Sequence, residues 1–270
     1  MPLILKSVPP IHGLRWVRDG FALFVRKPLA FASMFVLFLM AALLLSLLRN
    51  LGGLLQMMLL PLLSLGFMVA GQSALLGGPV GPMHFIEPLR GEASKRRSLM
   101  LMCLIYGVAA VAILLLCDTL SDNAMNRLQA LAAKASSKPE DIYAVVSEPC
   151  VFWAGVVGTV LGTGLSVVFW HAPALVHWGG QGLGQALFSS AFAVWRSKGA
   201  FTVFSLVWVA LILFFATASA LLFEALGMRQ MASSVALPAA LMFSTVFYIS
   251  VLFTFNDSFS GVAPPPQVEL

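Results

Sequence analysis

The chain has three cysteines, and two of them could form a disulfide. Cys117 and Cys150 lie at the two ends of a polar stretch that separates two apolar segments. A bridge could close this stretch in an oxidising compartment if the two Cα atoms come within about 7 Å of each other. The alternative is a pair of small buried hydrophobic side chains. Cys103 lies inside an apolar run, where we expect it only to pack.

Histidines are the next candidates, as metal ligands. His171 and His177 are six residues apart, so they do not share one face of a helix, and no cysteine or carboxylate is close to them in the sequence. A zinc site needs three or four such ligands. We therefore predict no metal site and expect both side chains at the membrane interface, bonded to the backbone or to lipid headgroups. His12 and His84 are expected on the same side.

One acid stands within a long apolar segment. A carboxylate inside a membrane is a functional candidate by default, but Glu224 is only three residues from Gly227, where the segment ends. Solvation, or pairing with Arg229, is the expected role. The apolar segments otherwise lack charge, which argues against a proton- or ion-coupled transporter. The sequence also lacks a phosphate loop, a zinc-protease helix, a nucleophile elbow and a dinucleotide fingerprint, so we predict neither catalytic residues nor a cofactor.

The elements that must position these residues are apolar. Of the 270 residues, 60% are hydrophobic and 10% are charged, whereas soluble domains average about 25% charged residues. Several apolar runs reach the roughly 20 residues that a helix needs to cross the hydrocarbon. The sequence therefore predicts an all-α polytopic membrane protein. Its six expected transmembrane helices are 29–48, 51–76, 99–117, 151–176, 200–226 and 235–255.

The remaining segments complete the expected domain plan. Residues 1–255 form one integral membrane domain, and residues 256–270, which contain three consecutive prolines, form a disordered tail. Residues 118–149 form the longest aqueous loop, with helices predicted at 123–135 and from Pro139 onward. The start of the chain has no apolar region before a cleavage site, so no signal peptide is expected. Kinks are expected at Pro61 and Pro173.

Two short amphipathic segments precede transmembrane helices. On a helical wheel of residues 12–27, Leu14, Val17, Phe21 and Phe24 share one face and the arginines the other, which suits a helix in the interface or one packed on its neighbours. Residues 183–195 form a similar segment. The sequence Arg-Lys-Pro-Leu-Ala-Phe at 26–31 matches Arg-Ser-Lys-Gly-Ala-Phe at 196–201. Residues 84–97 form a degenerate third copy, which predicts three units of surface helix, basic turn and helical hairpin.

The distribution of lysine and arginine sets the expected orientation. Eleven of the 16 basic residues fall on the side that holds both termini, and an excess of basic residues marks the cytoplasm. Both termini are therefore predicted to be cytoplasmic, and the loop at 118–149 periplasmic. We interpret the basic clusters as sites for anionic lipid headgroups rather than nucleic acid. The candidate residues are Arg15, Arg18, Arg26, Lys27, Lys95, Arg96, Arg97, Arg196 and Lys198.

Small residues line one predicted helix. Gly155, Gly158 and Gly162, with nearby Thr159 and Thr163, would let another helix approach closely. We expect a packing face within the bundle, with a homodimer seam as the weaker alternative.

At Ala172-Pro173-Ala174-Leu175-Val176, followed by the amphipathic segment and Arg196, the chain resembles a family of uncharacterised six-helix inner-membrane proteins of Gram-negative bacteria. Residues 13–18 and 62–68 are also similar to that family. A more distant likeness is to the membrane domain of some bacterial glycerophosphodiester phosphodiesterases, whose catalytic domain has no counterpart here. The resemblance implies an inner-membrane location and assigns no functional residues.

These observations predict a non-enzymatic inner-membrane protein that interacts with lipid and supports another membrane component. The alternative is a transporter or lipid-handling channel, which the repeats and the two proline kinks favour. A membrane-embedded enzyme would need histidines and acids clustered at one face. The expected partners are membrane lipids and another membrane protein, and the oligomeric state stays open.

Overall fold

The fold is known from a computed structural model, which describes residues 4–133, 139–228 and 231–260. It confirms the predicted class, because six helices are long and apolar enough to cross a membrane. The elements are β1 (Ile4–Leu5), α1 (His12–Arg26), α2 (Pro28–Ser46), α3 (Arg49–Leu75), η1 (Pro82–Phe85), η2 (Glu87–Arg90), α4 (Ala93–Leu120), α5 (Ala124–Ala133), α6 (Pro139–Val146), α7 (Pro149–Phe169), α8 (Ala172–His177), α9 (Leu183–Arg196), α10 (Lys198–Ala225), α11 (Met231–Ser258) and β2 (Phe259–Ser260).

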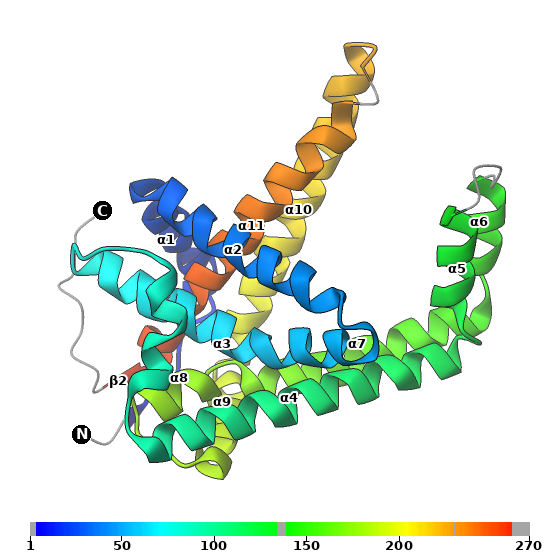
Figure 1. Cartoon of the computed structure of the whole chain (residues 1–270). Coiled ribbons are helices and arrows are strands. Elements are labelled where there is room, and N and C mark those ends of the chain that lie inside the picture. Colours follow the sequence, from blue (N-terminus) through cyan, green and yellow to red (C-terminus); the bar gives the residue numbers. More distant parts are fainter. Residues whose placement is uncertain (1–3, 134–138, 229–230, 261–270) are drawn as a thin grey trace.

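The six long helices form three hairpins, α2–α3, α4–α7 and α10–α11, which diverge from a common end (Figure 1). We call this end the base: it consists of α1, α8, α9, β1, β2 and the adjoining ends of the long helices. The opposite ends of the hairpins are called the tips. Figure 1 shows the α10–α11 tip well apart from α5 and α6, which extend the tip of the α4–α7 hairpin.

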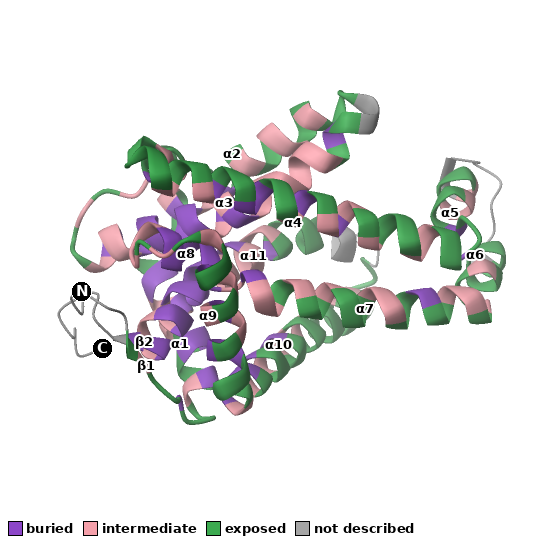
Figure 2. Ribbon diagram, turned by 90° about the horizontal axis from the view of Figure 1, so that it is seen from below, coloured by how far each residue is buried: buried purple, intermediate pink, exposed green. Residues whose placement is uncertain are grey.

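The core of the protein lies at the base. Figure 2 shows the buried residues concentrated there, whereas the tips are largely exposed. α11 is central, because it packs against α1, α2 and α3. The aromatic rings of Phe35, Phe67 and Tyr248 meet where α2, α3 and α11 come together, with centroids 5.8 to 6.2 Å apart.

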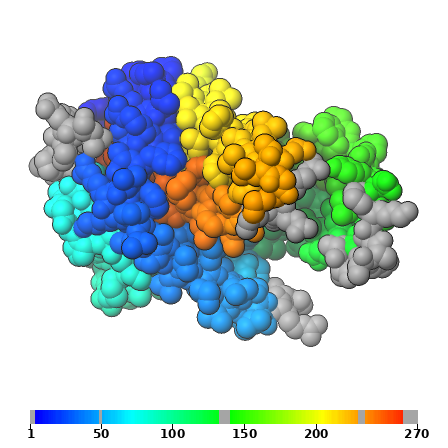
Figure 3. Space-filling view, turned by 90° about the horizontal axis from the view of Figure 1, so that it is seen from above, coloured from blue at the N-terminus to red at the C-terminus, as the bar shows by residue number. Residues whose placement is uncertain are grey.

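Two glycines let α1 fit tightly against its neighbours. A Cβ added at Gly13 would lie 2.3 Å from the carbonyl oxygen of Ala200 on α10, and one at Gly20 would lie 2.9 Å from Cβ of Ser250 on α11. Trp16 between them is 1% exposed. In Figure 3, α1 (dark blue) lies against the α10–α11 hairpin (yellow to orange). The packed face of α1 is thus centred on Trp16 and Gly20, and the predicted face is only partly right, since Leu14 is exposed.

The two ends of the described chain are joined at the base. β1 pairs antiparallel with β2, so that Leu5 is opposite Phe259. Nδ1 of His12 lies 2.7 Å from Oδ2 of Asp257, and the same oxygen accepts a hydrogen bond of 2.7 Å from Nε1 of Trp16. Both ends therefore lie on one side of the six spans. Residues 256–260, predicted as part of a disordered tail, belong to α11 and β2, and residues 261–270 lie outside the described part.

Several predicted boundaries shift. α4 begins at Ala93 rather than Leu99, so the basic run at 95–97 belongs to a helix and not to a loop. The helix predicted at 151–176 is divided into α7 and α8 at Trp170 and His171, just before Pro173. The three repeated units are present, but two short 3-10 turns, η1 and η2, replace the surface helix in the middle one. The loop at 118–149 folds into α5 and α6 near the predicted positions.

Candidate functional site

The nine basic residues predicted to contact lipid headgroups all lie at the base. Arg15, Arg18 and Arg26 are on the exposed side of α1. Arg18 forms an ion pair with Asp19 at 2.9 Å, and Nζ of Lys27 donates a hydrogen bond of 2.5 Å to the carbonyl oxygen of Gly78. The other five are on the first turns of α4 and around the junction of α9 and α10. The structure thus brings these residues to one end, in three groups.

The group on α4 stands beside a groove. Arg96 and Arg97 line one end of a cavity of about 690 Å³ between α3 and α4, whose other lining residues are almost all leucine and methionine. Neither guanidinium has an ion-pair or hydrogen-bond partner in the part of the chain that the structure describes. Lys95, next to them, pairs instead with Glu92 at 4.0 Å. This site joins unpaired positive charge to an apolar surface.

The group near α9 accompanies exposed aromatic rings. Phe188, Phe192 and Trp195 follow one another at helical spacing and are 71%, 46% and 71% exposed. The opposite face of α9, with Ser190 and three small apolar residues, is buried in the base. Nζ of Lys198 lies 5.4 Å from the ring centroid of Trp195. An outward aromatic stripe next to basic residues is the arrangement of a helix that lies in a membrane interface.

His171 is the polar centre of the base rather than an interfacial residue, so the prediction for it was wrong. Its side chain is fully buried and meets the rings of Phe255 and Phe259. The hydroxyl of Thr254 donates its proton to the carbonyl oxygen of Val251 at 2.7 Å, so Nε2 of His171 is the donor in its 3.0 Å contact with that hydroxyl. Nδ1 of His171 has no partner within the described residues.

His84 and His12 hold segments in place at the base. His84 contacts Glu87 at 2.9 Å and the carbonyl oxygen of Pro79 at 3.1 Å, while His12 contacts Asp257. No group of three or more potential metal ligands occurs among residues 4–133, 139–228 and 231–260. Arg229, the residue expected to pair with Glu224, lies outside the described residues.

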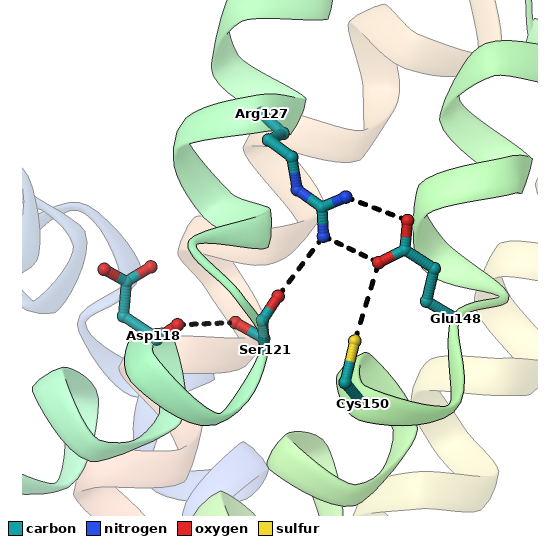
Figure 4. A network of polar contacts seen from close by, with 5 residues as sticks. All are labelled: Asp118, Ser121, Arg127, Glu148 and Cys150. Atoms are coloured by element: carbon teal, nitrogen blue, oxygen red, sulfur yellow. Dashed lines mark hydrogen bonds and ion pairs between the residues drawn. The ribbon is translucent and has the colours of Figure 1, made fainter.

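A compact polar cluster lies at the tip of the α4–α7 hairpin (Figure 4). The guanidinium of Arg127 on α5 donates two hydrogen bonds, of 2.8 and 2.6 Å, to the two carboxylate oxygens of Glu148, and a third of 3.3 Å to the carbonyl oxygen of Ser121. These hydrogen bonds lower the pKa of Glu148 below its ordinary value and raise the pKa of Arg127. The pair ties α5 to the start of α7.

The disulfide between Cys117 and Cys150 is not formed, and both thiols are free. Sγ of Cys117 lies 2.8 Å from the position of a Cβ added at Gly158 on α7. Cys150 lies eight residues earlier on the same helix, a distance of about 12 Å at 1.5 Å per residue. Its thiol contacts Glu148 at 3.5 Å. The two cysteines therefore lie at different levels of the hairpin, too far apart for a bridge.

We had expected the glycines of α7 to form a packing face within the bundle, but two of the three do not. Gly158 packs on Cys117, but a Cβ added at Gly155 or Gly162 would meet no atom within 4 Å. Gly162 and Thr163 instead line a groove of about 810 Å³ between α7 and α10. Trp208 on α10 also lines it, and its buried Nε1 has no hydrogen-bond partner among the described residues.

A small cavity lies beside the proline of α3. It measures about 140 Å³ and is bounded by Pro61 and by four residues that carry hydroxyl groups, Ser64, Tyr106, Ser166 and Tyr248. Since α3, α4, α7 and α11 all contribute to it, this cavity lies where the three hairpins meet.

Sequence reasoning missed the partners that make these sites. Thr254 was assigned to an apolar helix and Asp257 to the tail that follows it. Nothing in the local sequence connects Thr254 to His171 or Asp257 to His12. The pairing of Arg127 with Glu148 spans 21 residues. The start of α4 could have been found, because Ala93 to Arg97 contains no helix-breaking residue and follows Gly91.

Comparison with known proteins gives one relative of nearly full length. The chain is 32% identical over 268 residues to a probable inner membrane protein of Burkholderia thailandensis, and the match covers 98% of this chain and 97% of the relative. No protein-family model matches the chain, and no solved structure does.

Proposed function

Since the chain belongs to the family of the Burkholderia thailandensis inner membrane protein, we propose that it is a non-enzymatic accessory protein that binds anionic lipid in the cytoplasmic leaflet. The relative is an inner-membrane protein of a Gram-negative bacterium, as the sequence resemblance implied. With six apolar spans, the chain is a multi-pass inner-membrane protein. Its lipid ligand, its orientation and its supporting role are the steps that we propose.

The proposed orientation puts the base in the cytoplasm. All eleven basic residues on the side of the termini belong to the base or to the segments next to it, and lysine and arginine concentrate at the cytoplasmic ends of spans. The pairing of β1 with β2 supports the same side for both ends. In this orientation α5, α6 and the bidentate pair of Arg127 and Glu148 face the periplasm.

The observation that carries the proposal is the outer face of α9. Its three exposed rings, Phe188, Phe192 and Trp195, fit the depth of headgroups and upper acyl chains, where aromatic residues concentrate. Arg196 and Lys198 follow at the end of the stripe. Near a membrane surface each basic residue contributes roughly 1 kcal/mol of attraction to anionic lipid, so the three basic groups of the base together favour an anionic leaflet.

The accessory part of the proposal is supported by the groove between α7 and α10. Gly162, where an added Cβ would meet no atom within 4 Å, lines this groove and leaves room for the close approach of a helix. A transmembrane helix of another membrane protein, with small residues at that depth, would fill this space. Membrane lipid and such a helix are therefore the proposed partners.

The proposal is tested by the lipid that leaves the membrane with the protein. We expect a variant with Arg15, Arg18, Arg96 and Arg97 changed to glutamine to co-purify, in mild detergent, with several-fold less phosphatidylglycerol relative to phosphatidylethanolamine. The matched variant with lysine at the same four positions keeps the charge and is expected to retain the lipid. Equal lipid ratios in the glutamine variant and the unmodified protein would refute the proposal.

A lipid-handling channel is the second candidate, and the cavity beside Pro61 favours it. The four hydroxyl-bearing residues that line this cavity provide hydrogen-bonding groups inside an apolar protein, where a headgroup could pass. Liposomes containing the protein would then move a fluorescent phospholipid between leaflets, and Ser166→Leu, which fills the cavity, would slow this movement. Transfer equal to that of protein-free liposomes would exclude this candidate.

A further inference from the structure

The groove between α3 and α4 is formed by two helical stripes that face each other. On α4, Ala93, Arg97, Met100 and Leu104 recur at intervals of three or four residues, which places them on one face. On α3, positions 55, 58, 59 and 62 supply leucine and methionine in the same way. The groove is therefore a continuous strip that runs along both helices, with large apolar side chains on each wall.

Beyond Leu104, the groove is closed by tight contact between the two helices. A Cβ added at Gly107 on α4 would lie 2.4 Å from Cγ of Met58 and 3.3 Å from the carbonyl oxygen of Leu54. Glycine lets α3 and α4 touch at this level, so no chain can pass between them there. An occupant must enter from the lipid side and lie along the surface.

The length of the groove matches one leaflet. Eleven residues separate Ala93 from Leu104, which corresponds to about 16 Å of helix. Half of the hydrocarbon core is about 15 Å thick. The arginines are at the end next to the base and the leucines at the end toward the middle of the bilayer. A molecule with a charged end and an apolar body of leaflet length fits this order.

The charge at the inner end calls for an anion. Arg96 and Arg97 have no partner among the described residues, and two guanidinium groups side by side recognise phosphate well. Glu92, the N-cap residue of α4, makes no capping hydrogen bond through its side chain, and its carboxylate pairs with Lys95 at 4.0 Å. The positive end of the helix dipole adds to the positive charge of the two arginines.

The apolar walls distinguish a lipid from a protein helix. Helices that pack in membranes approach over small residues, whereas this groove is lined by side chains such as Leu59, Leu62 and Met100. The flexible methionine and leucine side chains suit an acyl chain, which has no fixed shape of its own.

We propose that this groove is a specific binding site for one anionic phospholipid of the cytoplasmic leaflet, with its phosphate on Arg96 and Arg97 and an acyl chain along α3 and α4. The proposal rests on the proposed function for the class of ligand and adds a defined site with a stoichiometry of one. It predicts that a single lipid stays bound where the other lipids around the protein exchange.

Native mass spectrometry of the full-length protein, released from mild detergent and titrated with phosphatidylglycerol, tests the site. We expect the first bound lipid to be weakened about tenfold by Arg96→Gln with Arg97→Gln, since two charge contacts are lost. Met100→Trp should have a comparable effect without a change in charge, because it fills the groove. Met100 is 54% exposed, so the larger ring can be accommodated without disturbing the core.

The matched control is Lys6→Gln with Arg90→Gln, which removes two charges from the same side of the protein at positions that do not line the groove. It should bind the first lipid as the unmodified protein does, and phosphatidylcholine should give no comparable first adduct. The groove proposal is overturned if Met100→Trp binds normally, or if the control loses the lipid as strongly as the groove variant. In that second case the co-purified lipid would still fall in the four-arginine variant, so the proposed function would stand while the site would not.

Discussion

Two phenylalanines on one helix show how differently the base and the tips are built. Phe204 and Phe214 are ten residues apart on α10, yet Phe204 is 1% exposed and Phe214 is 75% exposed. The first packs edge to face with Trp16 and Trp170, while the second faces away from the protein. Whole spans also differ in how much protein covers them. Only 6% of the most apolar stretch of α10 is buried, against 44% in α3.

The comparison shows that the two regions are stabilised differently, the base by packing within the protein and the tips by contact with lipid. At the base, apolar burial and hydrogen bonds such as that of His171 with Thr254 resemble those of a water-soluble core. At the tips, exposed leucines need no protein partner, because lipid chains are as apolar as they are. Packing therefore determines the arrangement of the hairpins at the base, and the surrounding lipid satisfies their outer halves.

The largest effect should come from removing a ring at the base. Phe204→Ala is expected to destabilise the protein by about 3–5 kcal/mol, as for other fully buried aromatic residues. Phe214→Ala, on the same helix, should change the free energy of unfolding by less than about 0.5 kcal/mol. Denaturation in mixed detergent micelles measures both. Similar losses in the two variants would mean that the tip is also packed against protein.

A smaller effect is expected from adding a single methyl group. Gly13→Ala forces a Cβ against the backbone of α10 and should cost about 1–3 kcal/mol. Gly155→Ala on α7 meets open space, and it should leave stability unchanged or raise it by up to about 1 kcal/mol, because alanine favours a helix. Thermal unfolding in detergent compares the pair. A destabilised Gly155→Ala protein would show that a second molecule covers that face.

The smallest effect is local and depends on pH. The pKa of Glu148 is lowered from its ordinary value of 4.5, so its pairing with Arg127 stabilises the tip above pH 4.5 and is lost as the pH falls through the lower, folded value. The protection of the α5 amides against hydrogen exchange, relative to the intrinsic exchange rate at each pH, should therefore fall in acid below pH 4.5, while protection at the base is unchanged.

Glu148→Gln is the control for this pH dependence. It removes the titrating group, so the protection of α5 should be lower at neutral pH and should no longer change with acid in this range. If the variant responds to acid like the unmodified protein, another group controls the tip.

The sequence predicts the parts of this fold that depend on local pattern. The six apolar spans, the basic ends and the helices near Asn123 and Pro139 all follow from composition and spacing. The structure agrees with them to within a few residues, except at the start of α4 and at the end of α7, which stops at Phe169. The repeat of Arg26 to Phe31 at 196–201 also correctly predicts that α2 and α10 each follow a short amphipathic helix.

Long-range pairing is the part that local pattern cannot provide. Whether Cys117 meets Cys150 depends on how far α4 and α7 are shifted along each other. In this structure Cys117 packs against Gly158, where a side chain would leave no room for the thiol. The burial of His171 depends on Thr254, 83 residues away. The open glycines of α7 could not be foreseen either, because a stripe of small residues looks the same whether its partner is in the same chain or in another.

The link between His12 and Asp257 has a consequence for how this protein is made. The two residues are 245 positions apart, and a ribosome adds roughly 5–20 residues per second, so α1 waits on the order of ten seconds or longer for α11. During this time the part of α1 that packs on α11 has no protein partner. The synthesis of α11 thus completes the packing around α1.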